Sequence, residues 1–93
     1  MEVLDILREH EDELKKRFAV KRIGVFGSFA RGEQKKRSDV DVLVEFSKTP
    51  DFFEFVRLEM HLEKLFGRKV DLVTKKALKP YIKDRILAET RYA

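Results

Sequence analysis

The chain has 93 residues and a formal net charge of +4; 43% of its residues are hydrophobic and 41% are charged. A chain of this length has room for one modest core, so we expect a single domain over residues 1–93. The sequence contains no cysteine, which excludes disulfides and thiolate metal sites and is typical of a reducing cytoplasm. No apolar run approaches the roughly 20 residues of a membrane helix, and the acidic, amphipathic N-terminus does not have the pattern of a signal peptide.

Basic residues outnumber acidic ones, 21 to 17, and such an excess is one feature of nucleic-acid-binding proteins. Most of these residues are scattered among acidic ones, which favours solvated helices over a nucleic-acid interface. We therefore do not expect nucleic acid as a partner. The one dense cluster, residues 35–37 (Lys-Lys-Arg), could attract either nucleotide phosphates or an acidic partner.

Residues 3–18 predict an amphipathic helix, because apolar side chains recur at helical spacing and three acidic residues precede basic ones by four positions. His10 lies near the apolar stripe and is interpreted as a boundary residue. Residues 20–26 predict an apolar strand. Gly24 interrupts this strand, which indicates either a close approach of another backbone or a β-bulge.

The predicted strand breaks at Gly27, and residues 28–32 predict a single helical turn that ends at Gly32. Free backbone amides, the Ser28 hydroxyl and the Arg31 guanidinium are groups that commonly bind phosphate. The turn is therefore a candidate phosphate site. A plain strand-to-turn transition, in which Ser28 caps the helical turn, is the alternative.

Residues 39–46 predict a second strand whose alternation places Asp39 and Asp41 on one face, with Cα atoms about 7 Å apart. Two neighbouring carboxylates repel each other, and a divalent cation is the usual partner that stabilises them. Mg²⁺ binds through one or two carboxylates together with substrate phosphates. Glu45 lies farther along the same face and is interpreted as an outer-edge charge.

Residues 52–66 predict a helix that ends at Gly67 and is capped at its start either by Thr49 before Pro50 or by Asp51 with Glu54. Its apolar side chains fall into two stripes. The main buried stripe is Phe52, Phe55, Leu58, Leu62, Leu65 and Phe66, and the flanking stripe is Phe53, Val56 and Met60. A helix that is apolar on two sides is either deeply buried or offers a contact surface to a partner.

Residues 69–73 predict a third strand, with Asp71 in its middle, and a last helix is expected from Pro80 to about Arg91. A buried aspartate is costly unless it is paired or binds a metal. The predicted fold class is α/β (α+β), with a small mixed sheet of three or more strands packed against about four helices.

The glycine-serine turn followed by two aspartates on the next strand resembles the fingerprint of the DNA-polymerase-beta-like nucleotidyltransferases. The fuller motif is similar to the minimal nucleotidyltransferase branch, whose members are often the antitoxin half of a pair with a HEPN-type ribonuclease toxin. The residues that carry this resemblance are Gly27, Ser28, Arg31, Gly32, Ser38, Asp39, Asp41 and Asp71.

The resemblance implies Mg²⁺-dependent transfer of AMP from ATP to a hydroxyl group, expected on a side chain of a cognate HEPN toxin. Asp39, Asp41 and Asp71 would hold the metal in a two-metal site, and Asp71 would also lower the pKa of the acceptor hydroxyl or take its proton. The nucleotide would be bound by Gly27, Ser28, Arg31, Gly32 and Ser38.

Other functions remain open at this point. The chain could neutralise a HEPN ribonuclease by direct binding without catalysis, or it could modify a small molecule as aminoglycoside nucleotidyltransferases do. A nucleic-acid-binding regulator rests only on the basic composition. A homo-oligomer is a further possibility.

Overall fold

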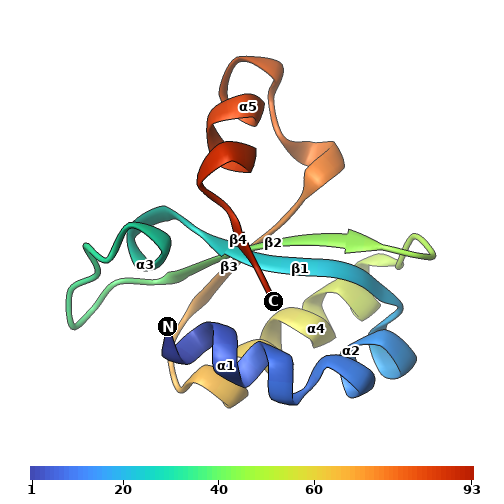
Figure 1. Cartoon of the computed structure of the whole chain (residues 1–93). Helices are drawn as coiled ribbons and strands as arrows, with labels where there is room; N and C mark the ends of the chain where they lie inside the picture. The colour runs from blue at the N-terminus through green and yellow to red at the C-terminus, as the bar shows by residue number, and fades with distance from the viewer.

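The computed structural model describes residues 1–93, which form a four-stranded mixed sheet with helices on both faces (Figure 1). The strands are β1 (Val20–Phe26), β2 (Val40–Phe46), β3 (Val70–Thr74) and β4 (Arg91–Tyr92). The helices are α1 (Glu2–Glu9), α2 (Glu11–Phe18), α3 (Gly27–Arg31), α4 (Phe52–Phe66) and α5 (Pro80–Glu89), and a 3-10 turn, η1, spans Lys75–Ala77. None of these helices is long and apolar enough to cross a membrane.

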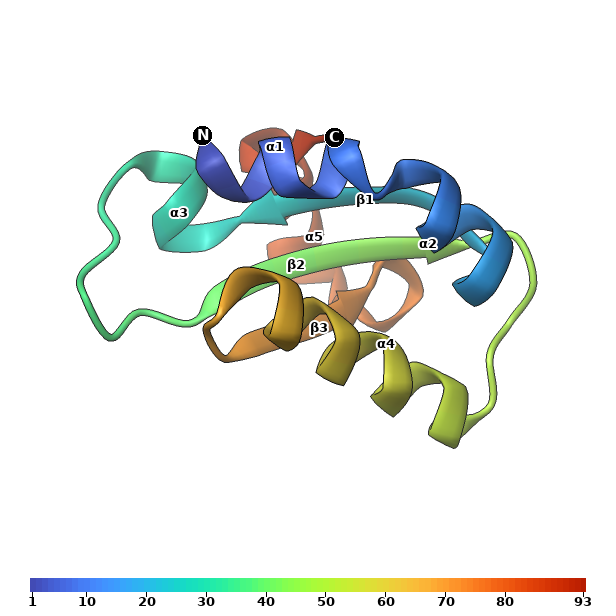
Figure 2. The ribbon, with the colours of Figure 1, turned by 90° about the horizontal axis from the view of Figure 1, so that it is seen from below.

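The sheet order is β3-β2-β1-β4. β1 pairs antiparallel with both β2 and β4, whereas β2 and β3 run parallel, which brings Asp41 beside Asp71. Helices α1, α2 and α4 cover one face of the sheet and α5 stands on the other (Figures 1 and 2). The expected mixed sheet and fold class are therefore confirmed.

The alternation along β2 divides its side chains between two cores. Val40, Val42 and Val44 are fully buried against the layer of α1, α2 and α4. Leu43 faces the other way and packs with Phe26 and Leu78 beneath α5. Burial of a side chain of this size contributes about 1.5–3 kcal/mol, so both faces of β2 are anchored.

The N-terminal segment forms two helices, so the expectation of one continuous helix over 3–18 was wrong. The break falls at His10, whose φ of −107° and ψ of 16° leave the helical region. Its ring nitrogen Nδ1 lies 2.9 Å from the Ile6 carbonyl oxygen. The change of direction allows the apolar residues of both α1 and α2 to reach the same core on the twisted sheet. His10 thus lies between two helices, and not at the edge of the apolar stripe of one helix.

The end of the chain also differs from expectation, because α5 stops at Glu89 and the next residues form the short strand β4. β4 pairs with β1 at Gly24 and Val25. A Cβ atom on Gly24 would lie 2.8 Å from the Arg91 carbonyl oxygen, which explains the glycine in this strand. The predicted close backbone approach is confirmed, and its partner is a segment that sequence analysis assigned to a helix.

Helix α4 has the predicted bounds, and of the two predicted caps the structure shows the one formed by Asp51 with Glu54. The Glu54 amide donates to Asp51 Oδ1 over 2.7 Å and the Asp51 amide donates to Glu54 Oε1 over 3.1 Å. The placement of Phe52 in the main buried stripe was wrong, because its side chain is 74% exposed. The first turn of α4 lies to one side of the strands (Figure 2), so the sheet does not cover it.

Candidate active site

The turn after β1 is shaped by the Asp41 carboxylate. Gly27 has a φ of +71°, which favours glycine, and a Cβ atom there would lie 2.1 Å from Asp41 Oδ2. Gly27 therefore provides both the backbone conformation and the space that the carboxylate occupies. This contact joins the glycine-serine turn to the middle of the acidic cluster.

The register of the parallel strands places Asp41 and Asp71 at paired positions on the same face of the sheet. Burial, followed by the nearby Asp71 and Asp39 carboxylates, raises the pKa of Asp41 above its ordinary value of 3.8, while the Arg31 charge opposes this shift. Asp39 and Asp71 are exposed. The structure thus pairs Asp41 with Asp71 through strand register and leaves Asp39 near enough for its charge to act on Asp41.

No three His, Cys, Asp or Glu side chains are grouped closely enough in this structure to hold a metal ion by themselves. The donors nevertheless suit magnesium, because they are carboxylate oxygens whose mutual repulsion a cation would relieve. Mg²⁺ usually binds to one or two carboxylates and completes its coordination with phosphate and water. The aspartate cluster fits an ion that arrives with a nucleotide better than a closed protein site.

The phosphate-binding groups predicted in the turn contact a carboxylate that sequence analysis missed. Glu89 Oε1 accepts the Gly27 N–H over 2.8 Å and lies 3.2 Å from Arg31 Nη1. Arg31 Nε also donates to Glu33 over 2.6 Å. The hydrogen bond to Glu33, followed by that to Glu89, holds the pKa of Arg31 above its usual value. Glu89 follows 62 residues after Gly27, so no local motif could have identified it.

The remaining predicted nucleotide-binding residues are Ser28, Gly32 and Ser38. The N-cap position of α3 is Phe26, so the alternative in which Ser28 caps the helix was wrong. Gly32 ends α3 in the left-handed conformation with a φ of +71°. Ser38 Oγ accepts the Lys35 N–H over 2.8 Å and thereby stabilises the loop between α3 and β2. Binding of a nucleotide by these residues stays a prediction.

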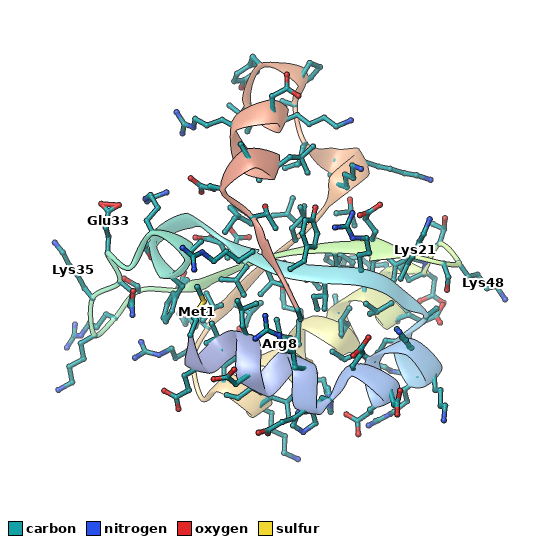
Figure 3. The ribbon with its side chains drawn as sticks, in the orientation of Figure 1. Met1, Arg8, Lys21, Glu33, Lys35 and Lys48 are labelled. Carbon is teal, nitrogen blue, oxygen red and sulfur yellow. The ribbon has the colours of Figure 1, made fainter.

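A second feature lies at the opposite end of β2, where a hollow of about 480 Å³ is lined by Lys21, Lys75, Lys76 and Lys83 together with Glu45. Figure 3 shows Lys21 at this end of the molecule, and Glu33 and Lys35 on the loop at the other end. Sequence analysis did not detect this group of lysines, because they come from separate segments.

The model of the nucleotidyltransferase domain matches residues 7–93. The chain belongs to the nucleotidyltransferase domain family. This confirms the family and the enzyme class that the motif implied. The match extends from the end of α1 to the last residue and includes the turn, the three aspartates and Glu89.

Two curated relatives of this nucleotidyltransferase come from archaea. The protein adenylyltransferase MntA of Thermococcus cleftensis is 50% identical over 91 residues, which are 98% of this chain and 92% of the relative. A Methanocaldococcus jannaschii protein, provisionally named a protein adenylyltransferase, is 52% identical over 92 residues, which are 98% of this chain and 94% of the relative.

Solved structures share the fold. A chain provisionally described as a minimal nucleotidyltransferase is 38% identical, with a TM-score of 0.81 and coverage of 97% of this chain and 92% of that one. A toxin-antitoxin complex with AMP-PNP gives 22% identity and a TM-score of 0.73, covering 90% and 69% of the two chains. The complex of a tri-AMPylated Shewanella oneidensis HEPN toxin with its MNT antitoxin contains a chain that is 18% identical, with a TM-score of 0.66. The match covers 96% of this chain and 70% of that one.

Proposed function

We propose that this nucleotidyltransferase is a Mg²⁺-dependent protein adenylyltransferase that transfers AMP from ATP to a side-chain hydroxyl of a HEPN-type toxin and so acts as an antitoxin. The observation that carries the proposal is the junction of the Gly27 turn with the Asp41–Asp71 pair. Phosphate-binding groups and carboxylates meet there within one site. The protein adenylyltransferase relatives and the solved HEPN complex support the choice of reaction and partner.

In this reaction the acceptor oxygen attacks the α-phosphorus of ATP, and a new oxygen–phosphorus bond forms. The bond between the α-phosphorus and the oxygen that bridges to the β-phosphate breaks, and pyrophosphate leaves with the electron pair. Asp71 would accept the hydroxyl proton, or would lower the pKa of that hydroxyl by helping to hold the metal. Arg31, Ser28 and the turn amides hold the β- and γ-phosphates, which keeps the attack in line.

Asp39, Asp41 and Asp71 would hold Mg²⁺, which supplies charge stabilisation for the phosphate oxygens when it is bound. The role of Asp41 follows from its surroundings. Its partly buried carboxylate lies against the Gly27 backbone and beside Asp71, so its position is the most constrained of the three. We therefore expect Asp41 to determine where the metal lies relative to the turn.

The partner surface is proposed to include the first part of α4. Phe52 and Phe53 are 74% and 71% exposed and stack edge-to-face with ring centroids 5.8 Å apart. Met60, farther along the helix, is 61% exposed. Large apolar side chains grouped on one surface are typical of protein contacts.

The proposal is tested by incubating the chain with α-labelled ATP, Mg²⁺ and a HEPN protein. Label on the HEPN protein is the expected result, and it should disappear with Asp41→Asn. Label on an aminoglycoside and not on the protein would instead indicate the small-molecule activity. Absence of label in every combination would overturn the enzymatic proposal.

The second candidate function, neutralisation by binding alone, is favoured by the same exposed phenylalanines. A stable complex that carries no label would support it. Replacing Phe52 and Phe53 by Glu should weaken the complex by about tenfold or more, because exposed aromatics often dominate interfaces. Tyr81→Glu is the matched control, since Tyr81 is an equally exposed aromatic (79%) on α5.

A further inference from the structure

Glu89 forms contacts with the turn that an anionic ligand would form. Its Oε1 atom accepts the Gly27 N–H over 2.8 Å, and its two carboxylate oxygens lie 3.2 and 3.3 Å from Arg31 Nη1. A backbone amide and a guanidinium that converge on two oxygens of one anion form an arrangement that also suits a phosphate group. In this structure, a carboxylate of the chain itself takes this place.

Glu89 and a triphosphate cannot both use these donors. The Gly27 amide has a single hydrogen, and the negative charges of a carboxylate and a phosphate repel each other at contact distance. The nucleotide must therefore either displace Glu89 or bind without the Gly27 amide and the Arg31 Nη1 group.

The position of Glu89 makes displacement feasible. It is the last residue of α5, its side chain is 25% exposed, and that of Arg31 is 49% exposed. The helix end is held separately, because Thr90 Oγ1 donates to the Ile86 carbonyl oxygen over 2.6 Å. A rotation of the Glu89 side chain can thus free the Gly27 amide without unwinding α5.

We propose that Glu89 occupies the phosphate-binding donors of the free enzyme and that the triphosphate of the nucleotide displaces it. Glu89 then lowers nucleotide affinity by competing with the phosphates for the Gly27 amide and the Arg31 guanidinium. This inference rests on the proposed function, which assigns Gly27 and Arg31 to the nucleotide phosphates.

The alternative is that Glu89 only ties α5 to the turn and stays in place when nucleotide binds. The two roles predict opposite results for nucleotide affinity. Loss of a structural tie would leave affinity unchanged or weaken it, whereas loss of a competitor would strengthen it.

The test compares Glu89→Gln, Glu89→Asp and Asp84→Asn with the unmodified chain. Glu89→Gln removes the charge that strengthens the two contacts. Glu89→Asp keeps the charge but shortens the side chain by one methylene group, so that it no longer reaches the Gly27 amide. Asp84→Asn removes a charge from an exposed position of the same helix, away from the turn.

We expect AMP-PNP to bind roughly tenfold more tightly to both Glu89 variants, measured by calorimetry without Mg²⁺, and Asp84→Asn to change affinity less than twofold. Hydrogen exchange of the Gly27 amide should speed up in both Glu89 variants before nucleotide is added. Thermal melting establishes that each variant is folded. The aspartate variant also keeps the test valid if the glutamine variant fails to fold.

Equal or weaker binding by folded Glu89 variants would overturn the competition and leave the proposed function intact. A gain of similar size in Asp84→Asn would also overturn it, because general electrostatics would then account for the effect. If neither the unmodified chain nor any variant binds AMP-PNP, with or without Mg²⁺, the proposed function fails and takes this inference with it.

Discussion

Asp41 and Glu45 lie on the same face of β2 but in opposite electrostatic surroundings. Asp41 is beside Asp71 and Asp39, and its pKa is raised by burial and by those charges. Glu45 has cations near both oxygens, with Lys75 Nζ and Arg22 Nη1 each 3.9 Å away. The two residues are only about 13 Å apart along the strand.

Leu43 separates these two carboxylates, because it is fully buried under Leu78 between them. The acidic end faces the turn, and the basic end faces the lysine-lined hollow. The comparison teaches that strand alternation decides which side chains share a face, whereas the segments packed against that face decide what each carboxylate does. Three predictions test it.

The largest expected effect is on catalysis. Asp41→Asn should lower the transfer rate by at least about 100-fold, because one of the carboxylates proposed to hold Mg²⁺ loses its charge. Glu45→Gln should leave the rate within about twofold, since Glu45 has lysine and arginine neighbours and lies away from the turn. Single-turnover transfer of labelled AMP measures both. Comparable losses in the two variants would contradict the division of roles along β2.

The second prediction concerns the two glycines of the turn, which share a φ of +71°. Gly32→Ala should cost about 1 kcal/mol of unfolding free energy, because only the backbone conformation is unfavourable. Gly27→Ala should cost about 1–3 kcal/mol more, because the added methyl group overlaps the Asp41 carboxylate. Urea denaturation measures the difference. Equal costs would show that Asp41 moves away freely and is not held by the turn.

The smallest expected effect is on the pH dependence of stability without Mg²⁺. The pKa of Asp41 is raised in the folded state, so the folded protein binds more protons than the unfolded chain between 3.8 and the folded value. The Asp41 contribution therefore favours folding at low pH and is lost as the pH rises through this window.

Asp41→Asn should accordingly be slightly more stable than the unmodified chain near pH 7, and the gain should fade toward pH 3.8. Mg²⁺ should stabilise the unmodified chain more than the variant, because the variant lacks one carboxylate. Thermal melts across pH, with and without Mg²⁺, measure both trends. If the variant is less stable than the unmodified chain at pH 7, the charged Asp41 carboxylate stabilises the fold, which would contradict the unfavourable effect of burial and of the Asp71 and Asp39 charges.

The sequence alone determined the local features of this nucleotidyltransferase. The alternation around Asp41, the capping box at Asp51 and the glycine at the end of α4 depend on neighbouring residues, and these predictions agree with the structure. The paired aspartates were recognisable for the same reason, since spacing within a strand defines a shared face.

The tertiary structure alone decided which distant groups meet. The contact of Glu89 with Gly27, the pairing of β4 with Gly24 and the exposure of Phe52 depend on how the helices lie against the sheet. No local pattern carries this information. The two contacts join segments that are far apart in the chain, and Phe52 is exposed because the sheet does not cover the first turn of α4. The nucleotidyltransferase motif was thus visible in short stretches of sequence, whereas the carboxylate that contacts Gly27 and Arg31 became visible only in the fold.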